Sequence, residues 1–293
     1  MQHIIEFTKA SGAGNDFVLI DNMEGRLDVD KAKLAVAVCS RHFGVGADGL
    51  LLLEPSQEAD FFMRYYNADG SYGGMCGNGG RCVAHYAYLH EIARSPMRFM
   101  ALDHIYQAEI VASAVRLKMK DPFDFRRAET IHVGEQKLSA FFVNTGSPQA
   151  VIFEEAIDNV EVERLGRHIR YHKLFAPDGT NVNFVRTSSS GAIEIRTYER
   201  GVERETLACG TGAVASATIV ALERGFIAPI PVKVRSGEEL VVHFRASSNK
   251  ITDVFLEGSA HLLFTGKFTY DAAAGELVGI EREQSHQFPS AFR

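Results

Sequence analysis

Residues 76–79 (CGNG) return 133 positions later as residues 209–212 (CGTG). Each tetrapeptide opens an apolar segment, which runs to about His90 in the first case and to about Glu223 in the second. Residues 212–222 carry no charge at all, and a helix that is apolar on every side is buried. We therefore predict two central helices, each of which begins directly after a cysteine.

The repeat extends well beyond these tetrapeptides. A shift of 133 residues aligns residues 17–99 with the later part of the chain without gaps, and it places Tyr65 on Tyr198 and Asn67 on Arg200. The order of helix, strands, glycine-rich turn and helix is the same in both copies. Chance similarity between two α+β segments is the alternative, and a common register over so long an alignment argues against it.

Ten short segments have the composition of β-strands and are bounded by turn residues. They cover residues 16–21, 50–54, 61–66, 98–102, 115–119, 150–153, 182–185, 192–198, 232–234 and 240–244. Residues 28–42 and 159–172 predict two further helices. We therefore predict an α+β fold with two pseudo-symmetric β-rich domains, in each of which a sheet or barrel is wrapped around a central helix.

The domain boundary is expected near residues 121–131, where prolyl and aspartyl residues interrupt the pattern. This gives an N-terminal domain of residues 1–125, which carries Cys76, and a C-terminal domain of residues 126–293, which carries Cys209.

The composition argues against several classes of protein. The 293 residues are 46% hydrophobic and 23% charged, which is typical of a globular protein and not of a disordered or collagen-like one. With 31 Lys and Arg against 37 Asp and Glu, the net charge of −6 argues against a nucleic-acid partner. Four cysteines are too few for a disulfide scaffold, and no signal peptide or membrane span is visible. We expect a cytoplasmic protein with reduced thiols that binds neither nucleic acid nor membranes.

Cys76 and Cys209 sit where chemistry is expected. A helix N-terminus offers backbone N–H groups and a partial positive charge, which lower the pKa of a thiol and bind carboxylates. Two such thiols facing each other across the domain cleft would suit the inversion of a stereocentre. One thiolate would remove a proton from carbon while the opposite thiol supplies one to the other face.

The motifs around these residues resemble those of the diaminopimelate epimerase family, whose members interconvert LL- and meso-2,6-diaminopimelate without pyridoxal phosphate. The matching stretches are residues 9–17 (KASGAGNDF), 41–49 (RHFGVGADG), 66–82 (YNADGSYGGMCGNGGRC), 179–183 (GTNVN) and 198–212 (YERGVERETLACGTG). The resemblance covers almost the whole chain. It implies an isomerase of lysine and cell-wall precursor synthesis with a small amino-acid substrate and neither cofactor nor metal. It also implies that the C-terminal strand, after about residue 265, returns to the first domain.

The same resemblance assigns roles to individual residues. Cys76 and Cys209 correspond to the two catalytic bases. The implied substrate-binding residues are Asn15, Asn67, Gly77, Asn78, Asn181, Glu199, Arg200, Gly210 and Thr211. Gly77-Asn78 and Gly210-Thr211 would hold the carboxylate at the reacting carbon.

Arg200 also makes sense without the resemblance. A substrate with a second amino-acid head presents a distal carboxylate, which a guanidinium binds in a fork. The alternative is a surface ion pair of Arg200 with Glu199 or Glu203, which would contribute little.

One stretch departs from the family pattern. The family usually has Asn or Ser followed by Pro-His where this chain has Ser147-Pro148-Gln149. Gln149 can orient a neighbour by hydrogen bonding, but it cannot take up a proton near pH 7. Either the nearby thiol depends on the helix and Glu199, or the rate is lower, or the substrate differs. The rival functions are therefore a racemase of another amino acid, such as histidine, on the same fold, and a dithiol binding or redox protein. A homodimer also stays open.

Overall fold

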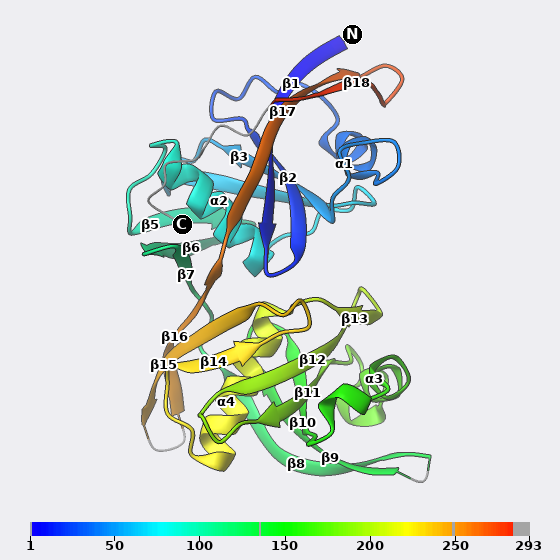
Figure 1. Ribbon diagram of the computed structural model, residues 1–293, viewed down its shortest axis with the longest axis vertical. Coiled ribbons are helices and arrows are strands. Elements are labelled where there is room, and N and C mark those ends of the chain that lie inside the picture. The colour runs from blue at the N-terminus through cyan, green and yellow to red at the C-terminus, as the bar shows by residue number, and fades with distance from the viewer. Residues whose placement is uncertain (1, 135, 248–249, 284–293) are drawn as a thin grey trace. The chain divides into compact units, whose positions relative to one another are not determined.

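The computed structural model describes residues 2–134, 136–247 and 250–283 (Figure 1). The chain divides into two compact units. Unit 1 comprises the residues up to Leu117 together with those from Gly258 onward, and unit 2 comprises Lys118–Glu257. The predicted division after residue 125 falls inside a strand, β8 (Phe123–Val133). The expected interruption at Asp121 and Pro122 lies in the short connection between this strand and β7 (Ala114–Lys118).

The strands of unit 1 pair in the order β17–β1–β2–β3–β4–β5–β6–β7. Their bounds are β17 (His261–Asp271), β1 (Gln2–Gly12), β2 (Asn15–Asp21), β3 (Gly49–Glu54), β4 (Phe61–Asn67), β5 (Met97–Ala101), β6 (His104–Val111) and β7. The pairs β2–β3 and β4–β5 are parallel, and the other pairs are antiparallel. One further strand, β18 (Glu276–Arg282), pairs with the free side of β17.

Unit 2 repeats this pairing scheme. Its order is β8–β9–β10–β11–β12–β14–β15–β16, with the parallel pairs at β10–β11 and β12–β14. The bounds are β9 (Gln136–Asn144), β10 (Pro148–Phe153), β11 (Asn181–Thr187), β12 (Ile193–Glu199), β14 (Ile230–Lys233), β15 (Glu239–Ser247) and β16 (Lys250–Ser259), with the short β13 (Arg204–Thr206) beside β12. The prediction of two copies of one β-rich domain is confirmed.

Each sheet surrounds its own central helix. In unit 1, α2 (Gly77–Leu89) packs against β1, β2, β3, β4, β6 and β17, and in unit 2, α4 (Gly210–Arg224) packs against β9, β10, β11, β12, β14 and β15. The residues of α4 from Gly212 to Val220 are all buried. Because strands cover α4 on many sides, burying polar side chains along it would cost free energy. This explains why residues 212–222 carry no charge.

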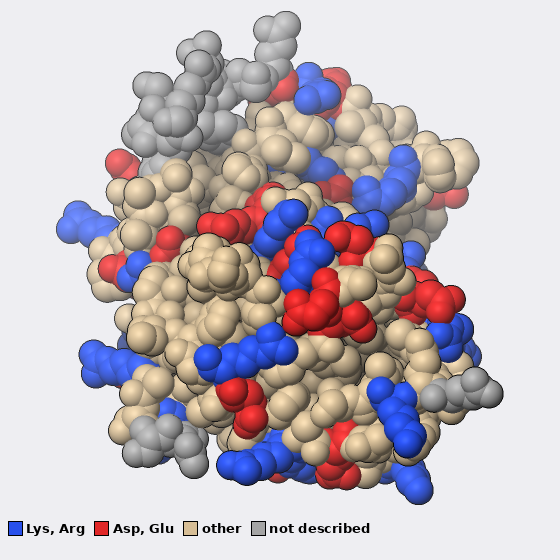
Figure 2. Space-filling view, turned by 60° about the horizontal axis from the view of Figure 1, so that its bottom comes forward, with Lys and Arg blue, Asp and Glu red and all other residues tan. Residues whose placement is uncertain are grey.

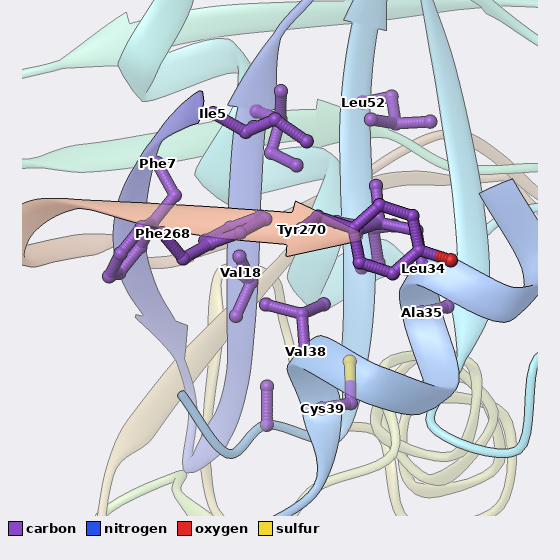
Figure 3. Close-up of a cluster of buried hydrophobic side chains, with 13 residues drawn as sticks. Ile5, Phe7, Val18, Leu34, Ala35, Val38, Cys39, Leu52, Phe268 and Tyr270 are labelled. Carbon is purple, nitrogen blue, oxygen red and sulfur yellow. The ribbon is translucent and has the colours of Figure 1, made fainter. Parts of the chain in front are cut away.

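A second helix covers the outer face of each sheet. In unit 1, α1 (Lys31–Cys39) packs against β2, β3, β4 and β18, and Leu34, Val38 and Cys39 meet Phe268 and Tyr270 of β17 in one apolar cluster (Figure 3). In unit 2, α3 (Val162–Arg170) packs against β8, β11, β12 and β13. Strands between two helix layers are buried on both faces, which explains why β3 (GLLLLE) is apolar at nearly every position.

The surface carries charges of both signs. On the face seen in Figure 2, Lys and Arg side chains lie beside Asp and Glu side chains. Elsewhere among the ion pairs, Arg164 lies 2.7 Å from Glu161 and Arg186 lies 3.0 Å from Asp158. Among the helices that the structure describes, none has the length and hydropathy needed to span a membrane.

Candidate active site

Cys76 is the N-cap residue of α2. Its backbone is extended, with φ −117° and ψ 121°, and its carbonyl accepts from Gly80 N at 2.7 Å. The N–H groups of the first helical turn, which include those of Gly77 and Asn78, have no carbonyl partner within a helix. They give this end of α2 a partial positive charge beside the thiol.

A tight hairpin brings Asn15 to the same helix. Gly12 and Asn15 pair across the two-residue turn between β1 and β2, in which Ala13 and Gly14 have φ values of 52° and 93°. Two positive φ angles in succession are typical of a type I′ turn, which suits the right-handed twist of a hairpin. A side chain on Gly12 would approach Asn78 O to 2.9 Å, so glycine lets the turn lie against the start of α2.

The amides of Asn15 and Asn78 bond to each other. Asn78 Nδ2 donates to Asn15 Oδ1 at 2.5 Å, and Asn15 Nδ2 donates to Asp48 Oδ2 at 3.0 Å. Asn78 Oδ1 in turn accepts from the buried Arg81 at 2.8 Å. The row thus runs from a guanidinium through two amides to a carboxylate.

An ion-pair network supports this row. Arg41 Nη2 lies 2.8 Å from Asp16 Oδ1 and 2.7 Å from Asp48 Oδ1, and the buried Lys9 lies 2.7 Å from Asp16. Burial alone would raise the pKa of Asp16, but the hydrogen bonds from Arg41 and Lys9 outweigh it and hold that pKa below its ordinary value. Asp16 is therefore ionised at neutral pH.

Asn67 lies in a different turn of unit 1, at the end of β4. Its Nδ2 donates to Ser71 Oγ at 2.9 Å, and its N–H donates to Ser71 O at 2.9 Å. The recorded bonds of Asn67 thus connect it to this turn and not to the Asn15–Asn78 pair.

Cys209 occupies the matching position in unit 2, as the N-cap residue of α4. Its φ of −126° and ψ of 110° are close to those of Cys76, but it is only 5% exposed. Its Sγ lies 3.5 Å from Thr211 Oγ1. A side chain on Gly212 would clash with Asn183 Oδ1 and lie 3.3 Å from this sulfur, so glycine is required there.

The side chain of Gln149 hydrogen-bonds to both Ser147 and Thr211, and Thr211 is the residue that contacts the Cys209 thiol. The Gln149 side chain is fully buried, and its Nε2 donates to Ser147 Oγ at 2.8 Å and to Thr211 Oγ1 at 3.0 Å. Its Oε1 accepts from Asn183 Nδ2 at 2.9 Å. Every polar atom of the Gln149 amide is therefore satisfied inside the protein.

Asn181, Glu199 and Arg200 meet at the end of β12. Asn181 Oδ1 accepts from Arg200 N at 2.7 Å, and the Arg200 side chain donates to Asp178 O at 3.4 Å. Glu199 Oε2 accepts from Thr206 Oγ1 at 3.0 Å. Burial raises the pKa of Glu199, and the bond from Thr206 offsets only part of this rise.

The ion-pair alternative for Arg200 does not match the structure. Among the ion pairs of the described residues, Glu203 pairs with Arg170 at 3.1 Å, and none involves Arg200. The bonds of Arg200 that the structure records run to Asn181 and Asp178 instead.

Sequence reasoning missed several supporting residues. The most important are Asn183 in unit 2 and Lys9, Asp16, Arg41, Asp48 and Arg81 in unit 1, all of which lie inside the motifs quoted above. The other two cysteines, Cys39 and Cys82, are both buried. Burial raises the pKa of the Cys39 thiol to about 12, so it is not a reactive group.

Solved structures with this fold are numerous. A PhzF-family phenazine biosynthesis protein from Bacillus anthracis aligns with a TM-score of 0.71 at 14% identity, covering 90% of this chain and 99% of its own. A probable proline racemase from Agrobacterium radiobacter aligns with a TM-score of 0.65 at 17% identity, covering 89% and 92%. A hydroxyproline epimerase from Agrobacterium vitis gives 0.64 at 16%, covering 92% of each chain. The fold thus occurs in a phenazine biosynthesis protein as well as in a racemase and an epimerase.

Sequence comparison identifies the family to which the chain belongs. The family model for diaminopimelate epimerase matches residues 7–119 and 141–263. The diaminopimelate epimerase of Chlorobaculum tepidum is 44% identical over 88% of this chain and 99% of its own, and that of Aquifex aeolicus is 42% identical over 90% and 98%. The chain belongs to the diaminopimelate epimerase family and is an isomerase.

Proposed function

We propose that this isomerase converts LL-2,6-diaminopimelate to meso-2,6-diaminopimelate with Cys76 and Cys209 as its two acid–base groups. The observation that carries the proposal is the placement of both cysteines at the N-caps of equivalent central helices. Family membership agrees with this substrate, and the two thiols are the acid–base pair that the proton transfers need.

The proton inventory of the reaction is simple. One thiolate takes the proton from the reacting carbon and becomes a thiol, while the other thiol protonates the opposite face and becomes a thiolate. One C–H bond breaks and one forms, so the configuration inverts and no electrons are gained or lost. The enzyme is left with its thiol and thiolate exchanged, and a proton transfer with solvent restores the starting state.

The helix N-termini stabilise the intermediate charge. When carbon loses its proton, negative charge develops on the adjacent carboxylate. The N–H groups of Gly77 and Asn78 in α2, and of Gly210 and Thr211 in α4, are the donors that we assign to it. Donors held fixed by a helix need no reorganisation as the charge develops.

The distal head of the substrate needs a cation and several amides. We assign its carboxylate to Arg200, and we assign Asn15, Asn67, Asn181 and Glu199 to its remaining polar groups. The bond from Arg200 N to Asn181 Oδ1, at 2.7 Å, supports a shared role for these two residues. Asparagine suits such a site because its amide both donates to a carboxylate and accepts from an ammonium.

We further propose that the protein acts in the cytoplasm, since the mechanism requires reduced thiols. A homodimer is the assembly that we propose, because Ile4 of β1 and Val278 of β18 are 75% and 60% exposed in adjacent parts of one sheet. Sedimentation equilibrium gives the mass directly, and a monomer at micromolar concentration would contradict the dimer.

The decisive experiment is incubation with LL-diaminopimelate in heavy water. We expect meso product that carries deuterium at one stereocentre. An absence of product and of exchange, with the thiols shown to be reduced, would contradict the proposed substrate. L-histidine in the same assay tests the rival racemase, and loss of thiols without isomerisation would favour a redox protein.

A further inference from the structure

The hydroxyl of Thr211 lies beside the sulfur of Cys209 at the end of a partly buried hydrogen-bond array. The array also contains Ser147, Gln149 and two asparagines, and all of its side chains are uncharged amides and hydroxyls. A hydroxyl can either donate to a sulfur or accept from it. Which of the two occurs follows from the groups that fix the other end of the array.

A backbone carbonyl fixes the first branch. Ala150 O can only accept, so the atom of Asn183 that lies 3.1 Å from it is the amide nitrogen. The remaining N–H of that nitrogen points to Gln149 at 2.9 Å, and the Gln149 atom there must accept. Gln149 Nε2 is then directed toward Ser147 and Thr211, and its two N–H groups serve one hydroxyl each.

A backbone N–H fixes the second branch. Arg200 N can only donate, so the Asn181 atom 2.7 Å from it is the amide oxygen. Asn181 Nδ2 therefore faces Ser147 Oγ, at 3.3 Å, and donates to it. Ser147 Oγ now accepts from Asn181 and from Gln149, which occupies both of its lone pairs. Its own proton goes to Thr211 Oγ1, 3.2 Å away.

Thr211 is thereby left with one role. Its Oγ1 accepts from Gln149 at 3.0 Å and from Ser147 at 3.2 Å, so its lone pairs are filled and its proton must be donated. The remaining neighbour in the array is Cys209 Sγ, at 3.5 Å. We propose that Thr211 donates its hydroxyl proton to Cys209 and holds this cysteine as the thiolate, with Gln149 and Ser147 as positioning residues that keep the hydroxyl aimed at sulfur.

The consequence for the reaction deepens the proposed function and rests on it. A hydrogen bond to the charged form of a group favours that form, so Cys209 is the thiol that rests as the base. In unit 1 the position that matches Thr211 holds Asn78, whose side chain bonds to Asn15 and Arg81. The array thus polarises the sulfur of Cys209 without a titrating group. The side chains of Glu199 and Arg200, the charged residues of the proposed site in unit 2, are not members of this array.

The test is the pKa of Cys209 itself, measured from the pH dependence of its alkylation by iodoacetamide. All variants carry Cys76→Ser so that the second thiol has no influence, and peptide mass spectrometry reports Cys209 separately from Cys39 and Cys82. Thr211→Val should raise this pKa by about one unit or more, the effect of one hydrogen bond to a charged group. Thr211→Ser keeps the hydroxyl and should restore the lower value.

Thr218→Val is the matched control, because Thr218 is a buried threonine of the same helix whose hydroxyl lies outside the array. It should leave the pKa of Cys209 unchanged. An equal pKa in Thr211→Val and Thr211→Ser would overturn the inference, whether or not the wild type epimerises diaminopimelate in heavy water. A raised pKa in Thr211→Val alone, together with a wild type that fails the heavy-water assay, would support the array and reject the proposed substrate.

Discussion

The two units share one strand-pairing scheme, but their polar networks differ in charge. The network of unit 1 contains ionised side chains, and that of unit 2 consists of neutral amides and hydroxyls. The shift of 133 residues places Gln149 where unit 1 has Asp16, and Asn181 where it has Asp48. In unit 1 these positions are carboxylates, neutralised by Arg41 and Lys9, and their network supports an asparagine pair. In unit 2 they are amides, and their network leads to a sulfur.

The difference shows how a duplicated fold can separate stability from chemistry. Charge-assisted hydrogen bonds are the stronger kind, and a carboxylate with two cations holds its neighbours firmly. A full charge beside Cys209 would, however, alter its thiolate whichever sign it had. Neutral amides transmit an orientation without this effect, and for that reason they suit the unit with the more buried cysteine.

Removal of either thiol should have the largest effect. Cys76→Ser and Cys209→Ser should each lower kcat for epimerisation by about 10²–10⁴-fold, because general acid–base catalysis contributes about that much. The heavy-water assay measures both variants. Near wild-type turnover in either variant would show that the cysteine removed is not one of the two acid–base groups.

Disruption of the charged network should have the largest effect on stability. Asp16→Asn leaves Lys9 buried without its carboxylate, and we expect a loss of about 2–3 kcal/mol in the free energy of unfolding. Urea denaturation followed by circular dichroism measures it. Asp124→Asn removes the carboxylate of an exposed pair with Arg126 and should cost less than about 1 kcal/mol. Equal losses in the two variants would contradict a special role for the network.

The charged network should also make stability depend on pH. Since the pKa of Asp16 is lower in the folded protein than its ordinary 3.8, the ion pairs stabilise the fold above that pH. This contribution is lost as the pH falls through the folded pKa. The stability difference between wild type and Asp16→Asn should therefore shrink below about pH 4. Urea curves at pH 7, 5, 4 and 3 measure it, and a constant difference would mean that Asp16 is not the titrating group.

Introducing a titrating group into the array of unit 2 should change kcat only modestly but should alter its dependence on pH. Gln149→His puts a side chain of pKa about 6.5 into an array that is neutral in the wild type. A neutral histidine has one donor and one acceptor, so it cannot make the three bonds of Gln149. We expect kcat to change by less than about tenfold and its pH profile to gain an ionisation near pH 6–7. Superimposable profiles would show that position 149 does not communicate with the thiol.

Sequence reasoning predicted the strands that lie between helices, and also β5, β7, β14 and β15. β2, β3, β4, β10, β11 and β12 are apolar and short, and their repeat at one spacing made the fold predictable. β8 was missed because most of its residues (FDFRRAETIHV) are exposed, so it shows no alternation of apolar and polar residues. β17 was covered only as a C-terminal strand that returns to the first domain.

The sequence was enough to propose site residues but not to show how they are connected. Cys76 and Cys209 stand out because glycine follows each one at the start of a helix. Asn183 gives no such signal, since a buried asparagine in an apolar strand acquires its role only when β10 and α4 meet it. The direction of the array depends on Ala150 O and Arg200 N, two backbone groups that no side-chain pattern indicates.

The strand β17 has a consequence for how the protein is made. Unit 2 is one continuous segment, whereas unit 1 must wait for residues 261–271 before β1 has its second neighbour. During synthesis, domains fold as their residues leave the ribosome. We expect unit 2 to fold before unit 1, whose first strands lack β17 until residues 261–271 are available. The half of the enzyme that is synthesised first is then the half that is completed last.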